Sequence, residues 1–309
     1  MGKVAFIFPG QGSQQVGMGV DLVEEFAVAK ETFAQADNAL DIDISKLCFE
    51  GPTEDLQQTS NTQPAILTTS IAVYRVLKEK GIEPDIVAGH SLGEYSALVA
   101  AGVLDFTDAV KLVRRRGQLM EESDPSGKGT MAAIIGLNPK EVEEVCQKAS
   151  TAGVVEPANY NCPGQVVISG EKEGVEQATK LAQEAGAKKA IILNVSGPFH
   201  SSLMEPAGEK LSQELAEVNF NNAQVPVVTN VNAELTSKGE QFSQALIEQI
   251  SGSVRWEESI KAMIAGGVDT FIEVGPGRVL KGFMRRIDRK VTALNVEDLV
   301  SLEKTLKKL

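Results

Sequence analysis

Short runs of apolar residues alternate along the chain with longer segments in which apolar positions recur every three or four residues. The first pattern predicts buried β-strands and the second predicts helices with one buried face. Strands are expected at residues 3–8, 85–88, 224–231 and 270–274, and helices at 64–80, 95–101 and 105–120. Strands that alternate with helices favour a mostly parallel sheet covered on both faces. The two outer parts of the chain are therefore expected to form one α/β domain.

The middle of the chain follows a different order. Residues 124–129 are rich in Gly, Pro, Ser and Asp, a composition typical of a linker. The elements expected after it are strand, helix, strand, strand, helix and strand, at residues 130–136, 139–149, 154–159, 165–169, 173–185 and 189–195. This β-α-β-β-α-β order is that of the split βαβ arrangement. We therefore expect a small domain at residues 128–195, inserted into a large domain made of residues 1–127 and 196–309.

Composition excludes several classes of function. The formal net charge is −12, which argues against broad binding to nucleic acid or to anionic membranes. The apolar run at the N-terminus is too short for a secretion signal, and no run is long enough to span a membrane. Three cysteines without metal-ligand spacing fit a reducing compartment, and two histidines are too few for a usual zinc site. A cytoplasmic protein without a metal is expected.

The clearest chemical motif is G-x-S-x-G, which residues 89–93 match as G-H-S-L-G. A strand is expected before it and a helix after it, which is the context of a nucleophile elbow. The glycines permit a sharp turn that exposes the hydroxyl of Ser91. The N–H of Leu92, at the start of the helix, would then point toward a developing oxyanion. The alternative interpretation is a glycine-flanked serine in a tight turn.

A serine hydroxyl needs a base to become a good nucleophile. His200 is the candidate, because it lies in the rigid loop S-G-P-F-H-S at residues 196–201 and follows the serine in the hydrolase order. His90 adjoins Ser91 in the chain and is expected to pack beside the site. No aspartate or glutamate stands out as the third member of a triad.

The glycine-rich loop after the first strand, residues 10–14, raises the possibility of nucleotide binding. Its glycines do not give G-x-G-x-x-G, and G-K-[ST] is missing, so it fails both phosphate fingerprints. A polar loop at the end of a strand can instead supply hydrogen-bond donors to an oxyanion.

Three consecutive arginines, at residues 114–116, lie on a predicted helix. At about 100° per residue, Arg116 falls in the apolar stripe around Val113, whereas Arg115 points nearly the opposite way. A buried guanidinium needs an anionic partner, since an unpaired buried charge is costly. That partner is either a carboxylate of the protein or a carboxylate of the ligand.

Taken together, the motifs resemble those of the malonyl-CoA:acyl-carrier-protein transacylases of fatty acid synthesis. The matching segments run in family order over nearly the whole chain, at residues 8–14, 61–65, 89–95, 116–120, 159–161, 197–201 and 273–277. The resemblance implies a hydrolase-like α/β domain with a ferredoxin-like insert, which agrees with the layout above. It also implies that no cofactor or metal is needed, and that coenzyme A is a substrate.

The resemblance further implies residue roles in the reaction. Ser91 would carry the malonyl ester and His200 would be its base, oriented by the backbone carbonyl of Gln249 in place of an acid. Leu92 N–H and Gln11 would form the oxyanion hole.

Recognition of the substrate is implied in the same way. Arg116 would bind the free malonyl carboxylate, and Gln63, His90 and Asn159 are also assigned to substrate binding. The partners would be malonyl-CoA and an acyl carrier protein, which in this family is acidic. We expect the carrier to dock at the basic cluster formed by Arg285, Arg286, Arg289 and Lys290. A solvated helix face is the alternative for that cluster.

Two other classes of function stay open. A serine hydrolase or thioesterase would share the elbow, and a non-catalytic acyl-binding module would share the fold. The non-catalytic module is disfavoured because Ser91 and His200 are both present. A chain without fused synthase domains favours fatty acid synthesis over a polyketide pathway.

Overall fold

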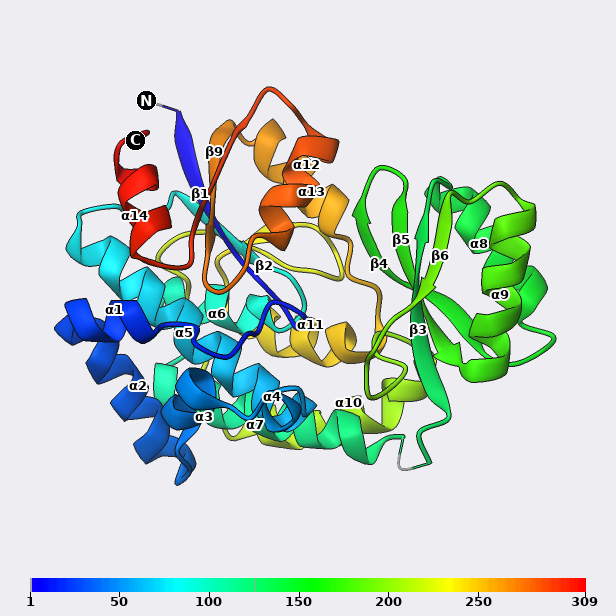
Figure 1. The fold of residues 1–309 in the computed structure, drawn as a ribbon, viewed down its shortest axis with the longest axis horizontal. Helices are drawn as coiled ribbons and strands as arrows, with labels where there is room; N and C mark the ends of the chain where they lie inside the picture. Colours follow the sequence, from blue (N-terminus) through cyan, green and yellow to red (C-terminus); the bar gives the residue numbers. More distant parts are fainter. Residues whose placement is uncertain (1, 125) are drawn as a thin grey trace.

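The computed structural model describes residues 2–124 and 126–309, and within them it has a larger and a smaller β-sheet that lie side by side (Figure 1). The larger sheet has the strand order β10-β9-β1-β2-β7-β8. Neighbouring strands are parallel from β10 to β7, and β8 is antiparallel to β7. The predicted, mostly parallel sheet is therefore confirmed. Its strands are β1 (Lys3–Phe8), β2 (Ile86–Gly89), β7 (Val227–Val228), β8 (Leu235–Thr236), β9 (Val268–Val274) and β10 (Thr292–Val296).

Alternate residues of the central strand β1 enter two different hydrophobic clusters. Phe6 and Phe8 pack into one cluster, and Ala5 and Ile7 pack into the other; the four side chains are at most 1% exposed. A central parallel strand is buried on both faces, which explains its continuous apolar run.

Helices cover both faces of the larger sheet, as predicted. On the Phe6 face, α5 (Thr59–Glu79), α6 (Gly93–Ala100) and α14 (Leu299–Leu306) lie against strands of the sheet, and α2 (Ala27–Leu40), α3 (Ile44–Glu50) and α4 (Thr53–Leu56) pack on α5. The same hydrophobic cluster also includes side chains of α1 (Val20–Glu25), α7 (Phe106–Glu122), α10 (Glu205–Ala216), α11 (Gly239–Ser251) and the short 3₁₀-helix η1 (Ser202–Met204). The Ile7 face is covered by α12 (Trp256–Ala265) and α13 (Val279–Ile287). No helix in the described part of the chain combines the length and apolarity needed to cross a membrane.

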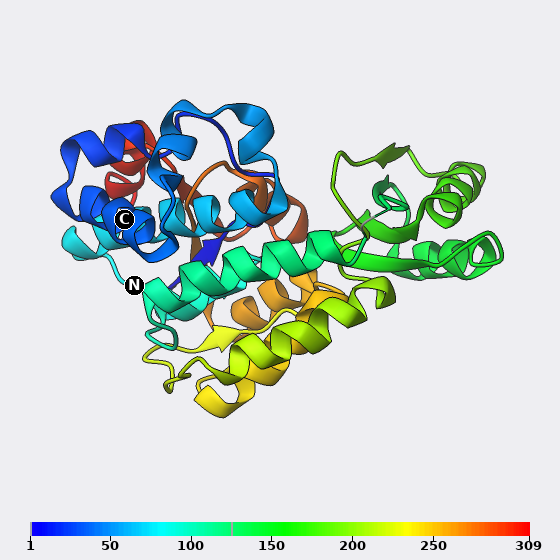
Figure 2. The ribbon, with the colours of Figure 1, turned by 90° about the horizontal axis from the view of Figure 1, so that it is seen from below.

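The smaller sheet is antiparallel and has the strand order β4-β5-β3-β6. Its strands are β3 (Gly129–Ile135), β4 (Val155–Cys162), β5 (Gln165–Glu171) and β6 (Lys189–Ile192), and its helices are α8 (Pro139–Ala149) and α9 (Lys172–Glu184). The predicted β-α-β-β-α-β order is confirmed, and β6 ends three residues earlier than expected. Figure 2 shows α7 leading from the helices of the larger sheet toward this smaller sheet.

Two predicted elements differ from the structure. Helix α5 begins at Thr59, not at residue 64, and contains Pro64 in its interior. The proline removes one helical hydrogen bond, but the turn before it buries Thr59, Thr62 and Gln63 completely, and this packing outweighs the loss. The strand expected at residues 224–231 is reduced to Val227–Val228. The other predicted elements begin and end within three residues of the prediction. Residue 125 of the predicted linker lies outside the described residues.

Candidate active site

Ser91 lies in the sharp turn between β2 and α6, as the motif predicts. Its backbone is left-handed, with a φ of 51°. The flanking glycines are required by close backbone approach: a Cβ on Gly89 would lie 1.9 Å from the backbone of Gly93, and a Cβ on Gly93 would lie 2.1 Å from the carbonyl oxygen of Phe8. The turn is therefore an elbow that only this spacing of glycines allows.

His200 faces the hydroxyl of Ser91. Its Nε2 lies 2.7 Å from Ser91 Oγ, and its Nδ1 lies 2.8 Å from the carbonyl oxygen of Gln249 and 3.2 Å from that of Gly252. Carbonyl oxygens only accept hydrogen bonds, so Nδ1 carries the proton and Nε2 is free to accept one from the serine. Burial and the nearby charge of Arg116 lower the pKa of His200 to about 3, which keeps the imidazole neutral. The arrangement is that of a nucleophile and its general base.

Arg116 is 1% exposed and points at the same hydroxyl. Its Nη2 donates to Ser91 Oγ at 3.2 Å and to Gln249 Oε1 at 3.0 Å, and its Nη1 donates to Gln63 Oε1 at 2.9 Å. Within residues 2–124 and 126–309 it forms no ion pair with a carboxylate, and its buried Nε–H has no acceptor. Desolvation lowers the pKa of the guanidinium. A protein carboxylate is thus ruled out as its direct partner in the described structure.

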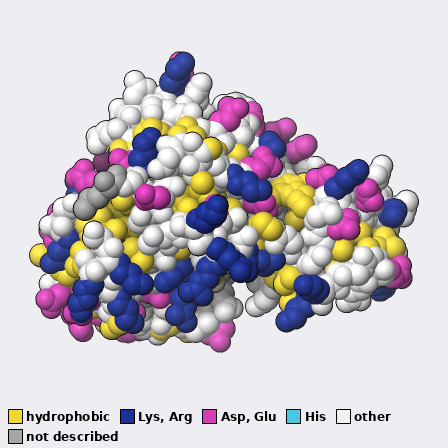
Figure 3. All heavy atoms as spheres, turned by 90° about the horizontal axis from the view of Figure 1, so that it is seen from above, with side chains coloured by type: hydrophobic (Ala, Val, Ile, Leu, Met, Phe, Trp, Pro, Cys, Tyr) yellow, Lys and Arg dark blue, Asp and Glu magenta, His cyan; other side chains and the backbone are white. Residues whose placement is uncertain are grey.

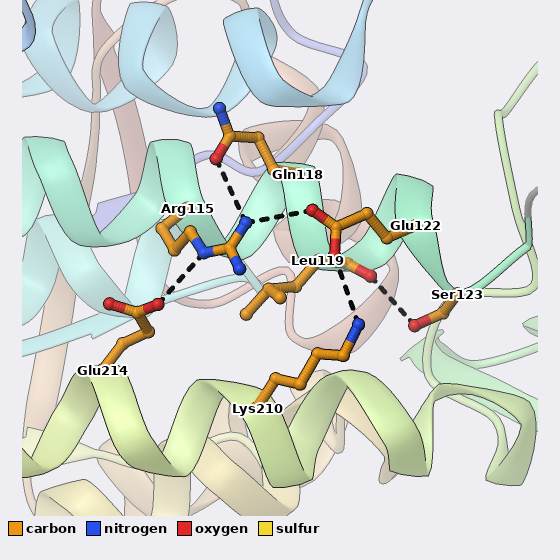
Figure 4. Close-up of polar contacts among 7 residues, drawn as sticks. All are labelled: Arg115, Gln118, Leu119, Glu122, Ser123, Lys210 and Glu214. Carbon is orange, nitrogen blue, oxygen red and sulfur yellow. Dashed lines mark hydrogen bonds and ion pairs between the residues drawn. The ribbon is translucent and has the colours of Figure 1, made fainter.

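Arg115 lies on the other side of α7, as the helix geometry predicts. It forms ion pairs of 3.0 Å with Glu122 and with Glu214, and all three side chains are at least 36% exposed (Figure 4). The two neighbouring arginines therefore differ completely in environment.

Gln249 connects these groups through both its backbone and its side chain. Its backbone carbonyl holds His200, as expected. Its side-chain Nε2 donates to the carbonyl oxygen of Ser91 at 3.0 Å and to Glu94 Oε2 at 2.8 Å, while its Oε1 accepts from Arg116. One residue thus touches the nucleophile, the base and the buried arginine.

A cavity of about 540 Å³ opens in front of Ser91, within the range usual for ligand sites. The predicted site residues that line it are Gln11, His90, Ser91, Leu92, Arg116, Asn159 and His200. Met120, Met131, Leu193 and Phe199 supply an apolar part of the wall. Gln63 and Gln249 are completely buried and support Arg116 from behind. The structure therefore brings all the predicted site residues together.

The groups expected at the oxyanion differ in their present bonding. Leu92 directly precedes α6, and its backbone N–H has no acceptor among the described residues. The side chain of Gln11 donates to Thr59 Oγ1 at 3.2 Å, and Thr59 in turn bonds Ser196 Oγ at 2.7 Å.

His90 packs beside the site. Its Nε2 lies 2.8 Å from Asn161 Oδ1, and its ring centroid lies 5.5 Å from that of Trp256. Burial lowers the pKa of His90, so this imidazole is also neutral.

Two polar residues of the site were not singled out from the sequence. Glu94 is completely buried in α6 and accepts hydrogen bonds from Gln249 and from the backbone of Asn230. Asn230 follows β7 and bonds the backbone of Ser91. A signal existed for each: Glu94 is the one charged residue in the apolar helix G-E-Y-S-A-L-V-A, and Asn230 lies at the carboxyl end of a parallel strand, where sites of open α/β sheets form.

Comparison with known proteins agrees with this geometry. Residues 5–307 match the family described as acyl transferase domain. The chain is 52% identical over 304 residues to the malonyl CoA-acyl carrier protein transacylase of Bacillus subtilis, covering 98% of this chain and 96% of the relative. The protein of that name from Escherichia coli K12 is 50% identical over 294 residues, covering 95% of each chain.

Solved structures give the same result. An acyl carrier protein S-malonyltransferase from Vibrio cholerae superposes with a TM-score of 0.95 at 49% identity, covering 98% of this chain and 99% of the other. A malonyl-transacylase in complex with its type II PKS acyl-carrier protein superposes with a TM-score of 0.97 at 45% identity, covering 99% and 100%. The chain therefore belongs to the acyl transferase family, as a member of its malonyl CoA-acyl carrier protein transacylases.

Proposed function

We propose that Ser91 carries a malonyl group from coenzyme A to the pantetheine thiol of an acyl carrier protein, in two successive transfers. The observation that supports this most strongly is the buried guanidinium of Arg116, which lies 3.2 Å from Ser91 Oγ and has no carboxylate as a direct partner among the residues that the structure describes. An acyl group that brings its own carboxylate supplies the missing anion.

In the first transfer, Ser91 Oγ attacks the thioester carbonyl and His200 Nε2 takes the hydroxyl proton. The bond from carbon to sulfur breaks, and the coenzyme A thiolate leaves with the proton from His200. The N–H of Leu92, together with Gln11, stabilises the oxyanion formed on the way. The positive imidazole that forms transiently faces the carbonyl oxygens of Gln249 and Gly252, which take the place of a triad carboxylate.

In the second transfer, the carrier thiol gives its proton to His200 and attacks the ester. The bond between the acyl carbon and Ser91 Oγ breaks, and His200 returns the proton to the serine. The ester has to survive attack by water until the thiol arrives.

Arg116 selects malonyl because its direct partners among the described residues are neutral groups. Gln63 and Gln249 fix the plane of the guanidinium through neutral amide oxygens. A carboxylate can then bind by parallel charge-assisted hydrogen bonds. Since the charge of Arg116 also lowers the pKa of His200, a bound malonyl carboxylate raises that pKa and makes the base stronger.

The carrier is proposed to dock at the basic cluster Arg285, Arg286, Arg289 and Lys290, whose four side chains are exposed at the end of α13. Arg286 reaches the β4–β5 hairpin, where it donates to the carbonyl oxygen of Pro163 at 2.6 Å and to Gln165 Oε1 at 2.8 Å. A hollow of about 230 Å³ lined by Gln165, Phe283, Gln11 and His90 adjoins the active-site cavity. Seen from above, Lys and Arg side chains gather in a band on this acidic protein (Figure 3).

We further propose a ferredoxin-like small domain, a hydrolase-like large domain and a cytoplasmic location. The βαββαβ order supports a ferredoxin-like small domain at residues 128–195, and the parallel sheet with its serine elbow supports a hydrolase-like large domain formed by residues 1–127 and 196–309. The reaction needs no cofactor or metal, and a cytoplasmic location fits the free, buried cysteines.

Intact-mass spectrometry after incubation with malonyl-CoA tests the role of Ser91. We expect a malonyl adduct on the native chain, none on Ser91→Ala, and loss of the adduct when holo carrier protein is added. A malonyl adduct on Ser91→Ala would remove Ser91 from the mechanism. Rapid release of free malonate without carrier would instead identify a thioesterase.

A further inference from the structure

Asn230 fills the gap that opens where β7 leaves β2, directly beside the Ser91 turn. Parallel pairing of the two strands ends with Val228 opposite Ala88. Beyond that point the side chain of Asn230 replaces backbone: its Nδ2 donates to the carbonyl oxygen of Gly89 at 2.6 Å, and its Oδ1 accepts from the N–H of Ser91 at 2.6 Å. A single amide group therefore bonds the backbone on both sides of His90.

Glu94 anchors this arrangement from the following helix. Its Oε2 accepts from the backbone N–H of Asn230 at 3.1 Å and from Gln249 Nε2 at 2.8 Å. Gln249 Nε2 also donates to the carbonyl oxygen of Ser91. Glu94, Asn230 and Gln249 are all completely buried. The side chains of Asn230 and Gln249 thus bond both backbone polar groups of Ser91. Glu94 in turn accepts from the backbone N–H of Asn230 and from the side chain of Gln249.

We propose that Asn230, anchored by Glu94, is a positioning residue that aims Ser91 Oγ at His200 and leaves the N–H of Leu92 as the backbone donor for the oxyanion. This inference rests on the proposed role of Ser91 as the nucleophile. The N–H of Ser91 is already bonded to Asn230, so it does not face the acyl group. The left-handed backbone of Ser91 persists only where its surroundings determine it, and Asn230 supplies two of the bonds that do so.

The chemistry of Asn230 admits few replacements. Aspartate has the same shape and can still accept from Ser91, but it sets a second acceptor against the carbonyl oxygen of Gly89. Alanine leaves both buried backbone groups without a partner. Glu94 needs only one acceptor oxygen to hold Asn230 and Gln249. Its Oε1 has no partner among the described residues, so a proton can sit there while Oε2 still accepts both hydrogen bonds. Burial raises the pKa of Glu94 to about 7, and Glu94→Gln keeps both hydrogen bonds.

A fluorophosphonate that modifies active-site serines tests the proposal. The rate constant of Ser91 modification, measured per folded molecule by intact mass, reports how well Oγ is aimed and activated. The variants are Asn230→Ala, Asn230→Asp and Glu94→Gln. The matched control is Asn295→Ala, which removes another buried asparagine of the same sheet that bonds Lys281 and Glu297. The kcat and KM for malonyl-CoA are measured alongside.

We expect Asn230→Ala and Asn230→Asp to lower both the modification rate constant and kcat by about 10- to 100-fold, because a small misplacement of a reacting atom has effects of that size. Their KM for malonyl-CoA should change little, since Asn230 lies behind the cavity. Asn295→Ala should keep a near-native rate constant, whatever it does to stability. Glu94→Gln keeps the acceptor oxygen and should therefore lose less than Asn230→Ala does.

Native rate constants per folded molecule in the two Asn230 variants would overturn the proposal and leave Asn230 a purely structural residue. If Asn230→Ala does not fold, Asn230→Asp decides alone. A loss in Glu94→Gln as large as that in Asn230→Ala would overturn the anchoring role assigned to the acceptor oxygen. If the native protein is not modified at Ser91 at all, Ser91 is not the nucleophile. That result contradicts the proposed function itself and is distinct from a failure of the positioning role of Asn230.

Discussion

Ser91 and His200 share a hydrogen bond of 2.7 Å, and both hold left-handed backbone, with φ angles of 51° and 59°. Such a conformation costs about 1–3 kcal/mol for a residue other than glycine. The protein therefore places backbone strain at both ends of the hydrogen bond between the proposed nucleophile and its proposed base. Ser91 is held by Asn230 and Gln249, and His200 is held by the carbonyl oxygens of Gln249 and Gly252.

This strain predicts that two inactive variants differ in stability. Ser91→Gly and Ser91→Ala both remove the hydroxyl, but only glycine adopts the left-handed backbone freely. Relief of the strain should make Ser91→Gly the more stable of the two by on the order of 1 kcal/mol. The greater conformational entropy of glycine in the unfolded chain reduces this difference. Urea unfolding of both variants at neutral pH measures the difference. A clearly more stable Ser91→Ala would mean that the elbow is not strained.

The low pKa of His200 predicts the pH dependence of acylation. The kcat/KM value reports the free enzyme, in which the pKa of His200 is about 3. We therefore expect kcat/KM for malonyl-CoA to show no histidine inflection near pH 6.5. As the pH is lowered, kcat should begin to fall at a higher pH than kcat/KM does, because bound malonyl neutralises Arg116 and so raises the pKa of His200.

Glu94, with a pKa of about 7, is the second group that titrates in this range. Measuring the same profiles in Glu94→Gln removes its contribution. An inflection of kcat/KM near pH 6.5 that survives in Glu94→Gln would contradict the assignment for His200.

The raised pKa of Glu94 also predicts how stability depends on pH. The folded protein binds this proton more tightly than the unfolded chain, whose glutamates titrate near 4.5. Between pH 4.5 and about 7, Glu94 therefore holds more protons in the folded state than in the unfolded state. The contribution of Glu94 to the free energy of unfolding falls as the pH rises through this range. His200 acts in the opposite direction between about 3 and 6.5, because its folded pKa is lowered.

The contribution of Glu94 is isolated by comparing the native protein with Glu94→Gln. From pH 5 to pH 7.5, the stability of the native protein should fall relative to that of Glu94→Gln, as measured by denaturant unfolding at each pH. Parallel curves for the two proteins would show that Glu94 titrates normally.

The carrier dock predicts an effect on one substrate only. Arg285→Glu is the cleaner variant, because Arg286 also bonds the β4–β5 hairpin and its replacement would disturb that contact. We expect Arg285→Glu to raise the KM for carrier protein several-fold, more strongly at low salt, and to leave the KM for malonyl-CoA unchanged. Lys304→Glu, an exposed charge reversal on α14, is the matched control. Equal changes for both substrates, or the same change in the control, would contradict a dock at this cluster.

The sequence predicted the parts of this protein that depend on local pattern. The apolar run of β1, the G-x-S-x-G turn and the helical stripe of α7 each have a period or spacing that sets burial directly, so Arg116 could be placed inside and Arg115 outside. The N–H of Leu92 was also indicated as an oxyanion donor by the motif, whereas the roles of Gln11 and Gln249 came from the family resemblance.

Contacts between distant segments could not be predicted in this way. Asn230 bonds Ser91 across 139 positions of the chain, and the side chain of Gln249 joins Glu94 across 155. No local pattern encodes such pairs. The start of α5 was missed for a related reason, because Pro64 gives a strong local signal that the tertiary packing of Thr59 and Gln63 overrides.

Arg116 is proposed to select the acyl group by its charge, and the comparison of Arg116→Ala with Arg115→Ala tests this role. Removing one partner of a buried charge pair costs on the order of 2–5 kcal/mol. For malonyl-CoA this corresponds to a loss of roughly 30-fold to several thousand-fold in kcat/KM. Arg115→Ala, on the same helix as Arg116, removes exposed ion pairs with Glu122 and Glu214 and a hydrogen bond to Gln118, and it should change little.

The most direct measurement is the ratio of kcat/KM for malonyl-CoA to that for acetyl-CoA in Arg116→Ala. Acetyl lacks the carboxylate, so its transfer should fall far less than that of malonyl. Its transfer should even improve where loss of the Arg116 charge raises the pKa of His200. We expect this ratio to collapse in Arg116→Ala and to stay native in Arg115→Ala. Equal losses for both acyl donors in Arg116→Ala would contradict it and make Arg116 a structural residue.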